Sequence, residues 1–281
     1  MRVLVTGSSG KMGGIVTRLL RAQHQVRGID RAAGAETDVV ADIRDDAALA
    51  RCVVNQDAVV HLAALHAPHR DIGATEAEFV AVNVEATSRL LRHARKTGVR
   101  RFVLASTTSV YGDALLDAQR AVWVTESLKP QPRDIYDETK LAAEALCAEE
   151  FSAGFVTTAL RISRCFDEPA REMALYRLYR GVAASDVAQG FAMALRAELK
   201  QFEAFNISAA TPFQAGDCAQ LKSDAGTVLK ARVPDIGKDF VTRNWLLPHT
   251  IDRVYVIAKA QAMLGYRPGE NYREFMDSQK I

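Results

Sequence analysis

The chain has 281 residues, of which 48% are hydrophobic and 25% charged, and its formal net charge is +2. This composition is typical of a globular protein with a sizeable core, and the small net charge gives no reason to expect nucleic acid or an anionic membrane as a partner. No apolar run approaches the roughly 18 residues of a membrane span, and the N-terminus has no signal-peptide layout. Four scattered cysteines favour a reducing cytoplasm.

A glycine-rich turn separates the first predicted strand from the first predicted helix. Residues 3–5 form a continuous apolar run, and Gly7, Gly10 and Gly13 follow it directly. The next predicted strand ends at Asp30. Glycines allow a tight turn and a close approach of backbone N–H groups to a pyrophosphate at a helix N-terminus, and a carboxylate accepts hydrogen bonds from ribose hydroxyls. A strand, a glycine turn, a helix and an acid in this order predict a dinucleotide-binding site.

Strand and helix patterns then alternate through residue 162. We expect strands at 38–42, 57–64, 101–105 and 156–162, helices at 43–54, 77–97 and 134–151, and mostly loop at 65–76 and 112–133. This alternation predicts an α/β fold with a Rossmann-type, doubly wound parallel sheet. The cofactor-binding Rossmann domain is expected to span residues 1–162.

The remaining residues, 163–281, are expected to form a small substrate-binding appendage, with some segments returning to the Rossmann core. We expect a strand at 182–185, a helix at 186–197 capped by Ser185, a strand at 205–207 and a helix at 251–264. The stretch 209–249 has no clear pattern.

A tyrosine and a lysine lie four residues apart on the predicted helix at 134–151. Tyr136 and Lys140 therefore share one face of that helix. The strand ending at Ala105 brings Thr107 and Thr108 to the same rim of the sheet. An ammonium beside a phenol favours the phenolate, so we expect Lys140 to lower the pKa of Tyr136 from about 10. We predict that Tyr136 exchanges a proton with a carbinol or carbonyl while a nicotinamide exchanges the hydride.

With these motifs in place, the sequence resembles the extended short-chain dehydrogenase/reductase family, also called the NAD-dependent epimerase/dehydratase family. The matching segments, in the family's order, are Thr6-Gly-Ser-Ser-Gly-Lys-Met-Gly13, Asp42-Ile-Arg-Asp45, His61-Leu-Ala-Ala64, Asn83-Val-Glu-Ala-Thr87, Ser106-Thr-Thr-Ser-Val-Tyr-Gly112 and Tyr136-Asp-Glu-Thr-Lys140. Together they are specific for the family and not for one substrate.

The resemblance implies a role for each matching position. Thr107, Tyr136 and Lys140 would be catalytic, with Tyr136 as the acid/base. NAD would be bound by Gly7, Ser9, Gly10, Lys11, Met12, Gly13, Asp30, Arg31, Asp42, Ile43, Leu62, Ala63, Ala64, Asn83, Ala105, Tyr136, Lys140 and Ile162. Asp30 favours NAD over NADP because a carboxylate repels a 2′-phosphate, although the adjacent Arg31 is able to bind one. Asn83 would be either structural or close to the cofactor.

The segment after residue 162 departs from the family's nucleotide-sugar enzymes. Those enzymes usually carry Arg-Tyr-Phe-Asn here, followed by a long section that grips the nucleotide. This chain has Leu160-Arg-Ile-Ser-Arg-Cys-Phe-Asp-Glu-Pro169, and only a short stretch separates Pro169 from Asp186. The short segment favours a smaller substrate and also resembles uronate dehydrogenases, which oxidise a free sugar acid at its anomeric carbon.

The substrate contacts expected from this pattern are Thr108, His66, Arg164 and Arg171, with the arginines binding a carboxylate or phosphate. The run Tyr176–Arg180 is either a further anion-binding segment or an ordinary helix surface. No metal site is expected among the scattered histidines.

We therefore expect an NAD-dependent oxidoreductase acting on a hydroxyl or carbonyl of a sugar or sugar-acid-like substrate. One alternative is a nucleotide-sugar epimerase or dehydratase that uses NAD within the turnover, and another is a catalytically idle NAD-binding regulatory protein. If the chain dimerises as relatives do, the helices at 77–97 and 136–151 would form the homodimer interface.

Overall fold

A seven-stranded parallel sheet lies at the centre of the computed structural model, which describes residues 1–279. Its strand order is β3-β2-β1-β4-β5-β7-β8. The strands are β1 (Arg2–Thr6), β2 (Gln25–Asp30), β3 (Val39–Val40), β4 (Ala58–His61), β5 (Arg101–Thr107), β7 (Val156–Ile162) and β8 (Glu203–Ile207). The order reverses between β1 and β4, and ligands of such sheets bind at the carboxyl ends of the strands beside this reversal. The predicted Rossmann-type fold is confirmed.

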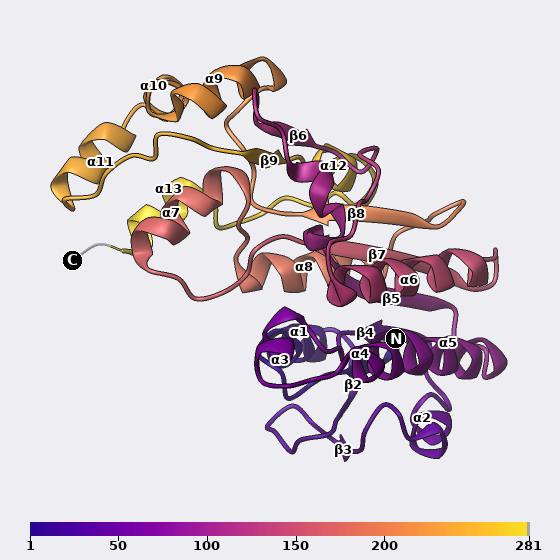
Figure 1. Cartoon of the computed structure of the whole chain (residues 1–281). Coiled ribbons are helices and arrows are strands. Elements are labelled where there is room, and N and C mark those ends of the chain that lie inside the picture. The colour runs from indigo at the N-terminus through magenta and orange to yellow at the C-terminus, as the bar shows by residue number, and fades with distance from the viewer. Residues whose placement is uncertain (280–281) are drawn as a thin grey trace.

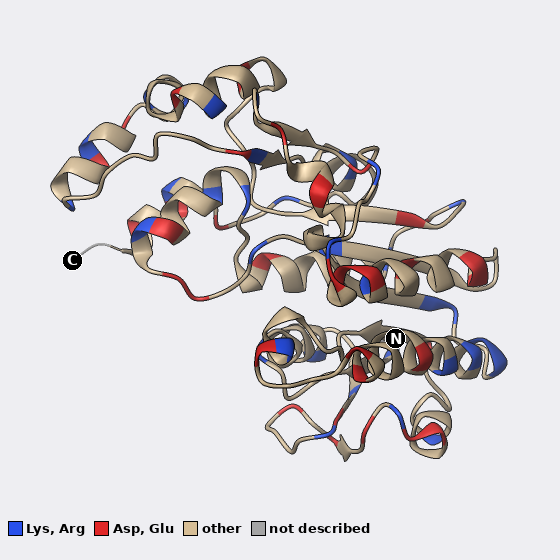
Figure 2. Ribbon diagram, in the orientation of Figure 1, with Lys and Arg blue, Asp and Glu red and all other residues tan. Residues whose placement is uncertain are grey.

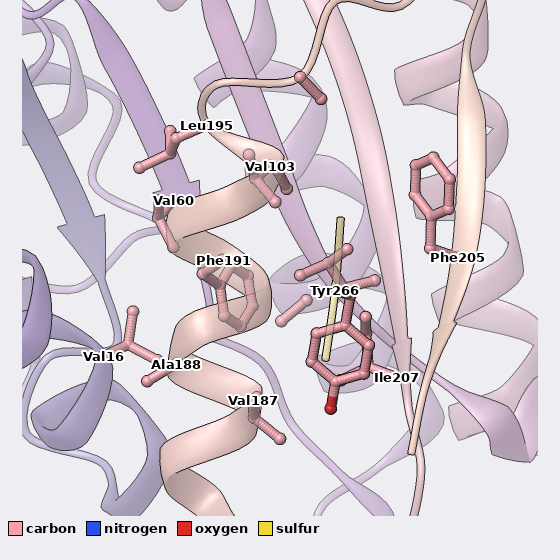
Figure 3. Close-up of a cluster of buried hydrophobic side chains, with 14 of the residues drawn as sticks. Val16, Val60, Val103, Val187, Ala188, Phe191, Leu195, Phe205, Ile207 and Tyr266 are labelled. Atoms are coloured by element: carbon pink, nitrogen blue, oxygen red, sulfur yellow. The ribbon is translucent and has the colours of Figure 1, made fainter. Parts of the chain in front are cut away.

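Helices cover both faces of the sheet (Figure 1). α1 (Lys11–Arg21) and α8 (Ala184–Ala194) pack on one face, whereas α2 (Asp46–Cys52), α5 (Ala86–Lys96) and α6 (Ile135–Glu150) pack on the other. Val3 and Val5 of β1 face the α8 layer, and Leu4 between them faces the α5 layer. Successive strand residues point to opposite faces, so a strand covered on both sides is apolar throughout. Figure 3 shows Phe191 of α8 among the buried side chains of the first layer.

The remaining elements form a second, smaller unit beyond the carboxyl edge of the sheet (Figure 1). They are a parallel pair of strands, β6 (Val122–Val124) and β9 (Arg253–Tyr255), with the helices α7 (Ala170–Tyr179), α9 (Cys218–Ser223), α10 (Ala225–Arg232), α11 (Ile236–Thr242) and α13 (Tyr272–Ser278). Their core contains Leu178, Leu221, Phe240 and Phe275. Both α8 and β8 belong instead to the Rossmann core, and α12 (Ala258–Leu264) packs against them.

Charged residues of both signs are interspersed over the ribbon (Figure 2). A local exception is the C-terminal turn of α5, where His93, Arg95 and Lys96 gather at the negative end of the helix dipole. Within residues 1–279, no helix is both long enough and apolar enough to cross a membrane.

Two predictions for the second half of the chain were wrong, and a third stretch had no predicted structure. Residues 182–185 form no strand, because α8 begins at Ala184 with Ala183 as its N-cap, which places Ser185 inside the helix. The helix predicted at 251–264 is divided into β9 and α12, since the apolar residues of β9 pair with β6. The unassigned stretch 209–249 contains three short helices.

Two predictions in the first half were also too coarse. The long helix at 77–97 comprises α4 (Glu76–Val80), a π-helical turn at Ala81–Glu85, and α5. The loops at 65–76 and 112–133 contain α3 (Ala67–Asp71) and β6, respectively. These elements are too short to show a hydrophobic period.

Candidate active site

The glycine turn after β1 leaves no room for a side chain at Gly7 or Gly13. Gly7 has φ +79°, and its N–H donates to the Ile29 carbonyl oxygen at 2.8 Å. A Cβ atom on Gly13 would lie 1.8 Å from the Gly7 carbonyl oxygen, and one on Gly7 would lie 2.7 Å from the backbone nitrogen of Ala63. Within the described chain, no side chain caps the N-terminus of α1. The first-turn N–H groups are therefore free to bind the pyrophosphate of a dinucleotide.

Asp30 is fixed beside this turn by backbone donors. Its carboxylate accepts hydrogen bonds from the N–H of Ser9 at 3.0 Å and from the N–H of Ala32 at 2.9 Å. A carboxylate has about four acceptor positions, so acceptor positions remain for ribose hydroxyls. The exposed Arg31 lines the same cavity as Asp30. This arrangement fits NAD.

A cavity of about 1190 Å³ extends along the carboxyl edge of the sheet from the glycine turn. The predicted cofactor residues on its wall are Gly7, Ser9, Gly10, Lys11, Met12, Gly13, Asp30, Arg31, Asp42, Ile43, Leu62, Ala63, Ala64, Ala105, Tyr136, Lys140 and Ile162. Asn83 is the exception. Its side chain is buried, where it exchanges hydrogen bonds with the backbone of Leu65 at 2.8 and 2.9 Å and donates to Thr139 at 3.0 Å. Asn83 therefore holds the loop that follows β4 against α6.

The three predicted catalytic side chains line the same cavity. Thr107 ends β5, and its hydroxyl forms a hydrogen bond with the hydroxyl of Tyr136 in the first turn of α6. Burial raises the pKa of Tyr136 to about 12, although the hydrogen bond from Thr107 opposes this shift. The predicted lowering of the Tyr136 pKa by Lys140 was therefore wrong for the chain without cofactor. Desolvation of the phenolate is the largest cause, and the nearby carboxylates of Asp137 and Asp134 raise the pKa further.

Lys140 is almost fully buried one helical turn after Tyr136. Burial lowers the pKa of Lys140 to about 8, and the nearby Glu144 carboxylate opposes the shift. Glu144 is itself buried and receives hydrogen bonds from Ser106 at 2.5 Å and from Arg161 at 2.7 and 3.0 Å. These buried contacts of Glu144 tie α6 to β5 and β7 and so fix the helix that carries Tyr136. The sequence signal for it is the spacing of 136, 140 and 144 on one helix face.

The structure places three of the four predicted substrate residues on the cavity wall and one outside the cavity. Thr108, His66 and Arg164 line the cavity, whereas Arg171 does not. The Arg171 guanidinium donates to the Leu246 carbonyl oxygen at 2.8 Å and to the Glu172 carboxylate at 2.8 Å. Because Arg171 lies in the first turn of α7, its side chain reaches the segment before β9 and not the cavity.

Several cavity residues were missed by the sequence reasoning. They are Arg133, Ser163, Arg253 and Tyr255, which come from three separate segments, whereas Arg180 belongs to the run 176–180 whose role the sequence left open. Arg180 directly follows α7, at the opposite end from Arg171. The run of basic and aromatic residues at 176–180 was the sequence signal for Arg180.

No metal centre is present among the described residues, where no group of three or more His, Cys, Asp or Glu side chains is arranged to hold an ion. His61 is instead a buried structural residue. Its ring nitrogens form hydrogen bonds with the hydroxyls of Thr6 at 2.6 Å and Thr87 at 2.9 Å. Burial lowers the pKa of His61 to about 3.

The fold, the glycine turn and Asp30 define a dinucleotide-binding protein of the Rossmann type. Residues 3–169 match the profile of the NAD dependent epimerase/dehydratase family, and the chain belongs to that family. The predicted family is thus confirmed, and NAD, the predicted cofactor, is the cofactor in the family's description.

Characterised relatives act on different substrates. The chain is 36% identical over 179 residues to the 3-beta-hydroxysteroid dehydrogenase of Mycolicibacterium neoaurum, covering 58% of this chain and 47% of the relative. It is 31% identical over 156 residues to the L-arabinose 1-dehydrogenase (NAD(P)(+)) of Haloferax volcanii, covering 52% and 59%. The matched segment thus spans about half the length of these relatives.

Solved structures resemble nearly the whole chain. MoeE5 in complex with UDP-glucuronic acid and NAD has a TM-score of 0.70 at 24% identity, covering 99% of this chain and 97% of the other. A mutated uronate dehydrogenase has a TM-score of 0.69 at 20% identity, covering 100% and 87%. At this identity the likeness shows the fold alone.

Proposed function

We propose that this protein is an NAD-dependent oxidoreductase that acts on a hydroxyl or carbonyl of a sugar-like substrate, with Tyr136 as the acid/base. The observation that carries the proposal is the hydrogen bond between Thr107 and Tyr136 in the same cavity as the glycine turn and Asp30. A protein that only bound or sensed the cofactor would not require a paired hydroxyl and phenol, with a buried ammonium, at this position.

The side chains have distinct tasks in the reaction. NAD, when bound by the glycine turn and Asp30, supplies the hydride chemistry. Tyr136 is protonated at neutral pH because its pKa is about 12, so its hydroxyl donates a proton to a carbonyl oxygen during reduction and its phenolate accepts one during oxidation. Thr107 orients the phenol by the hydrogen bond between the two hydroxyls. Lys140, with a pKa of about 8, is mostly cationic at pH 7 and would bind the cofactor one helical turn after Tyr136.

The short region beyond β7 supports a small, sugar-like substrate. Only the loop after Ile162 and the single helix α7 separate β7 from α8. A section this short supports a free sugar or sugar acid over a nucleotide sugar. We assign cofactor binding to residues 1–162 with the returning β8 and α8, and substrate binding to the rest of 163–279. The relatives named for L-arabinose and for UDP-glucose are consistent with a carbohydrate substrate.

The test is a screen for NADH formation at 340 nm. Purified protein with NAD is offered uronates, neutral aldoses, UDP-glucose and a 3β-hydroxysteroid, each with the wild type and with Tyr136→Phe. We expect net NADH from a free sugar or sugar acid, lost in the Tyr136→Phe variant. Turnover of UDP-glucose without net NADH would identify an epimerase, and oxidation of the steroid alone would overturn the sugar assignment.

We further propose a cytoplasmic homodimer. The reducing compartment is supported by the four cysteines, none of which forms a disulfide in the structure. The dimer would form through α5 and α6, which pack together with an ion pair between Arg95 and Glu150 at 2.8 Å. Light scattering after size-exclusion chromatography tests it, since a monomeric mass would exclude the dimer.

A further inference from the structure

The acidic side chains on the cavity wall are confined to one part of the chain, whereas basic side chains line the cavity along its whole length. The carboxylates on its wall, Asp30, Asp42 and Glu78, all come from the first 80 residues, which also supply the glycine turn. Among the described lining residues after Glu78, no carboxylate is present, whereas the arginines are Arg133, Arg164, Arg180 and Arg253. The far end of the cavity is therefore cationic, which favours an anionic ligand.

This cationic end adjoins the reacting groups. Thr107, the last residue of β5, is paired with Ile162, the last residue of β7. Neighbouring strands lie about 4.8 Å apart, so the segment that begins with Ser163 and Arg164 lies directly beside Thr107. The Arg164 N–H then donates to the Arg180 carbonyl oxygen at 3.0 Å, which anchors Arg180 to the same rim.

Arg180 differs from the other three arginines in having no carboxylate within ion-pair distance among the described residues, although its charge helps to lower the pKa of the nearby Asp252. The ion pairs of the others are Arg133 with Asp137 at 3.9 Å, Arg164 with Glu168, and Arg253 with Asp252. Within residues 1–279, no ion pair reaches Arg180, whose guanidinium instead lies 4.9 Å from the centre of the Tyr176 ring. A planar guanidinium held on an aromatic ring retains its hydrogen-bond donors for an oxyanion.

Two further donors at this end also have no partner. The hydroxyl of Ser163, a residue only 4% exposed, forms no hydrogen bond within the described chain, and neither does the Nε atom of Arg253. Both residues line the cavity. Buried polar atoms are nearly always hydrogen-bonded in folded proteins, so unpaired donors on two residues of the cavity wall favour a ligand that supplies an acceptor there.

We propose that Arg180, Ser163 and Arg253 form an oxyanion subsite that binds the carboxylate of a free sugar acid. The inference rests on the proposed function and specifies the substrate class for it. Arg180 supplies the unpaired charge, Ser163 supplies a hydroxyl donor beside Thr107, and the Arg253 Nε–H completes the set. A carboxylate held here leaves the rest of a small sugar to reach Tyr136.

Titration calorimetry on the protein saturated with NADH, which cannot accept a hydride from the sugar acid, tests the subsite without turnover. The probes are D-glucuronate, D-glucose, glucose 6-phosphate and UDP-glucose. The variants are Arg180→Gln and Ser163→Ala, with Arg171→Gln as the matched control, because Arg171 lies on the adjacent helix α7 but outside the cavity. We expect glucuronate to bind more tightly than glucose, and Arg180→Gln to weaken glucuronate binding by about 10- to 100-fold, as for a lost charge-assisted hydrogen bond.

Ser163→Ala is expected to weaken glucuronate binding by a smaller factor, and Arg171→Gln is expected to leave it unchanged. Unchanged glucuronate binding in Arg180→Gln would overturn the subsite. Tighter binding of glucose 6-phosphate or UDP-glucose would overturn the assignment to a carboxylate.

NADH formation separates the two proposals. If the wild type oxidises glucose as well as glucuronate and requires Tyr136 for both, the subsite fails and the proposed function stands. If glucuronate binding depends on Arg180 but no substrate yields NADH, the proposed function fails.

Discussion

The two ends of the cavity are built in different ways. The core of the cofactor end is built from the first 30 residues, with Gly7, Gly13 and Asp30 placed by two strands and by the turn and helix between them. The substrate end consists of side chains from distant segments, among them Arg133, Arg180 and Arg253. A backbone site requires particular residues at fixed spacing, whereas a side-chain site requires only that several loops meet. A short stretch of sequence therefore predicts the cofactor, whereas no single stretch predicts the substrate.

The largest expected effect lies where the two ends meet. Replacing Tyr136 by Phe removes the proton donor and acceptor, so we expect kcat/KM to fall by roughly 10²–10⁴-fold, with NAD affinity retained. Steady-state kinetics and titration of NAD measure the two quantities. Tyr272→Phe is the control, since it removes a hydroxyl that contacts Asp239 outside the cavity. Activity within a few-fold of wild type in Tyr136→Phe would contradict the assigned acid/base.

Two adjacent glycines test whether the cofactor end is formed by backbone packing. In Gly13→Ala the new methyl would lie 1.8 Å from the Gly7 carbonyl oxygen, so the turn must open. We expect about 1–3 kcal/mol lower stability and at least a tenfold loss of NAD affinity. Gly14→Ala is the control, because its nearest atom, the Ser8 carbonyl oxygen, lies 3.6 Å away. Equal effects in urea unfolding and NAD titration would contradict the packing argument.

A pH prediction concerns the strand beneath the cofactor end. The pKa of His61 is about 3 in the folded chain and 6.5 in its ordinary state, so below pH 6.5 the unfolded chain binds a proton that the folded chain does not. Stability should fall as the pH drops from 6.5 toward 3, by about 2 kcal/mol between pH 7 and pH 5. Urea unfolding of wild type and His61→Gln at both pH values measures it.

The variant should lose less stability on acidification than the wild type. His249→Gln, an exposed histidine, serves as the control. An identical pH response of wild type and His61→Gln would show that the burial of His61 does not cause the loss of stability at low pH.

The smallest expected effect is on cofactor choice. Replacing Asp30 by Asn removes the charge that repels a 2′-phosphate, so we expect the preference for NAD over NADP to fall by about tenfold, or about 1.4 kcal/mol. Kd values for the two cofactors measure it. Asp38→Asn, outside the cavity, should leave the ratio unchanged. A ratio that does not move in Asp30→Asn would leave Asp30 with only a structural role.

Much of the Rossmann half could be predicted from the sequence. β1, β4 and β5 are buried on both faces, so each is an apolar run followed by turn or polar residues, and the Tyr136–Lys140 spacing lies on one long helix. The second half offers no such periods, because α9, α10 and α11 have only six to eight residues each. Short helices show too few turns for a hydrophobic period to emerge.

One predicted substrate residue, Arg171, was misplaced for a related reason. Arg171 and Arg180 lie at opposite ends of α7, and only the path of the chain around that helix decides which end meets the cavity. The pKa of Tyr136 was misjudged because spacing along a helix reveals neighbouring charges but not the loss of water around them. Burial by segments far away in the sequence determines both outcomes.

The central claim is that one cavity joins hydride exchange at the cofactor end to a sugar acid at the substrate end. The most direct test is to supply D-glucuronate with deuterium on its anomeric carbon, together with NAD, and to examine the products by mass spectrometry. The account predicts net NADH that carries the deuterium, and none in Tyr136→Phe. Deuterium that remains in the sugar, with no NADH formed, would contradict it.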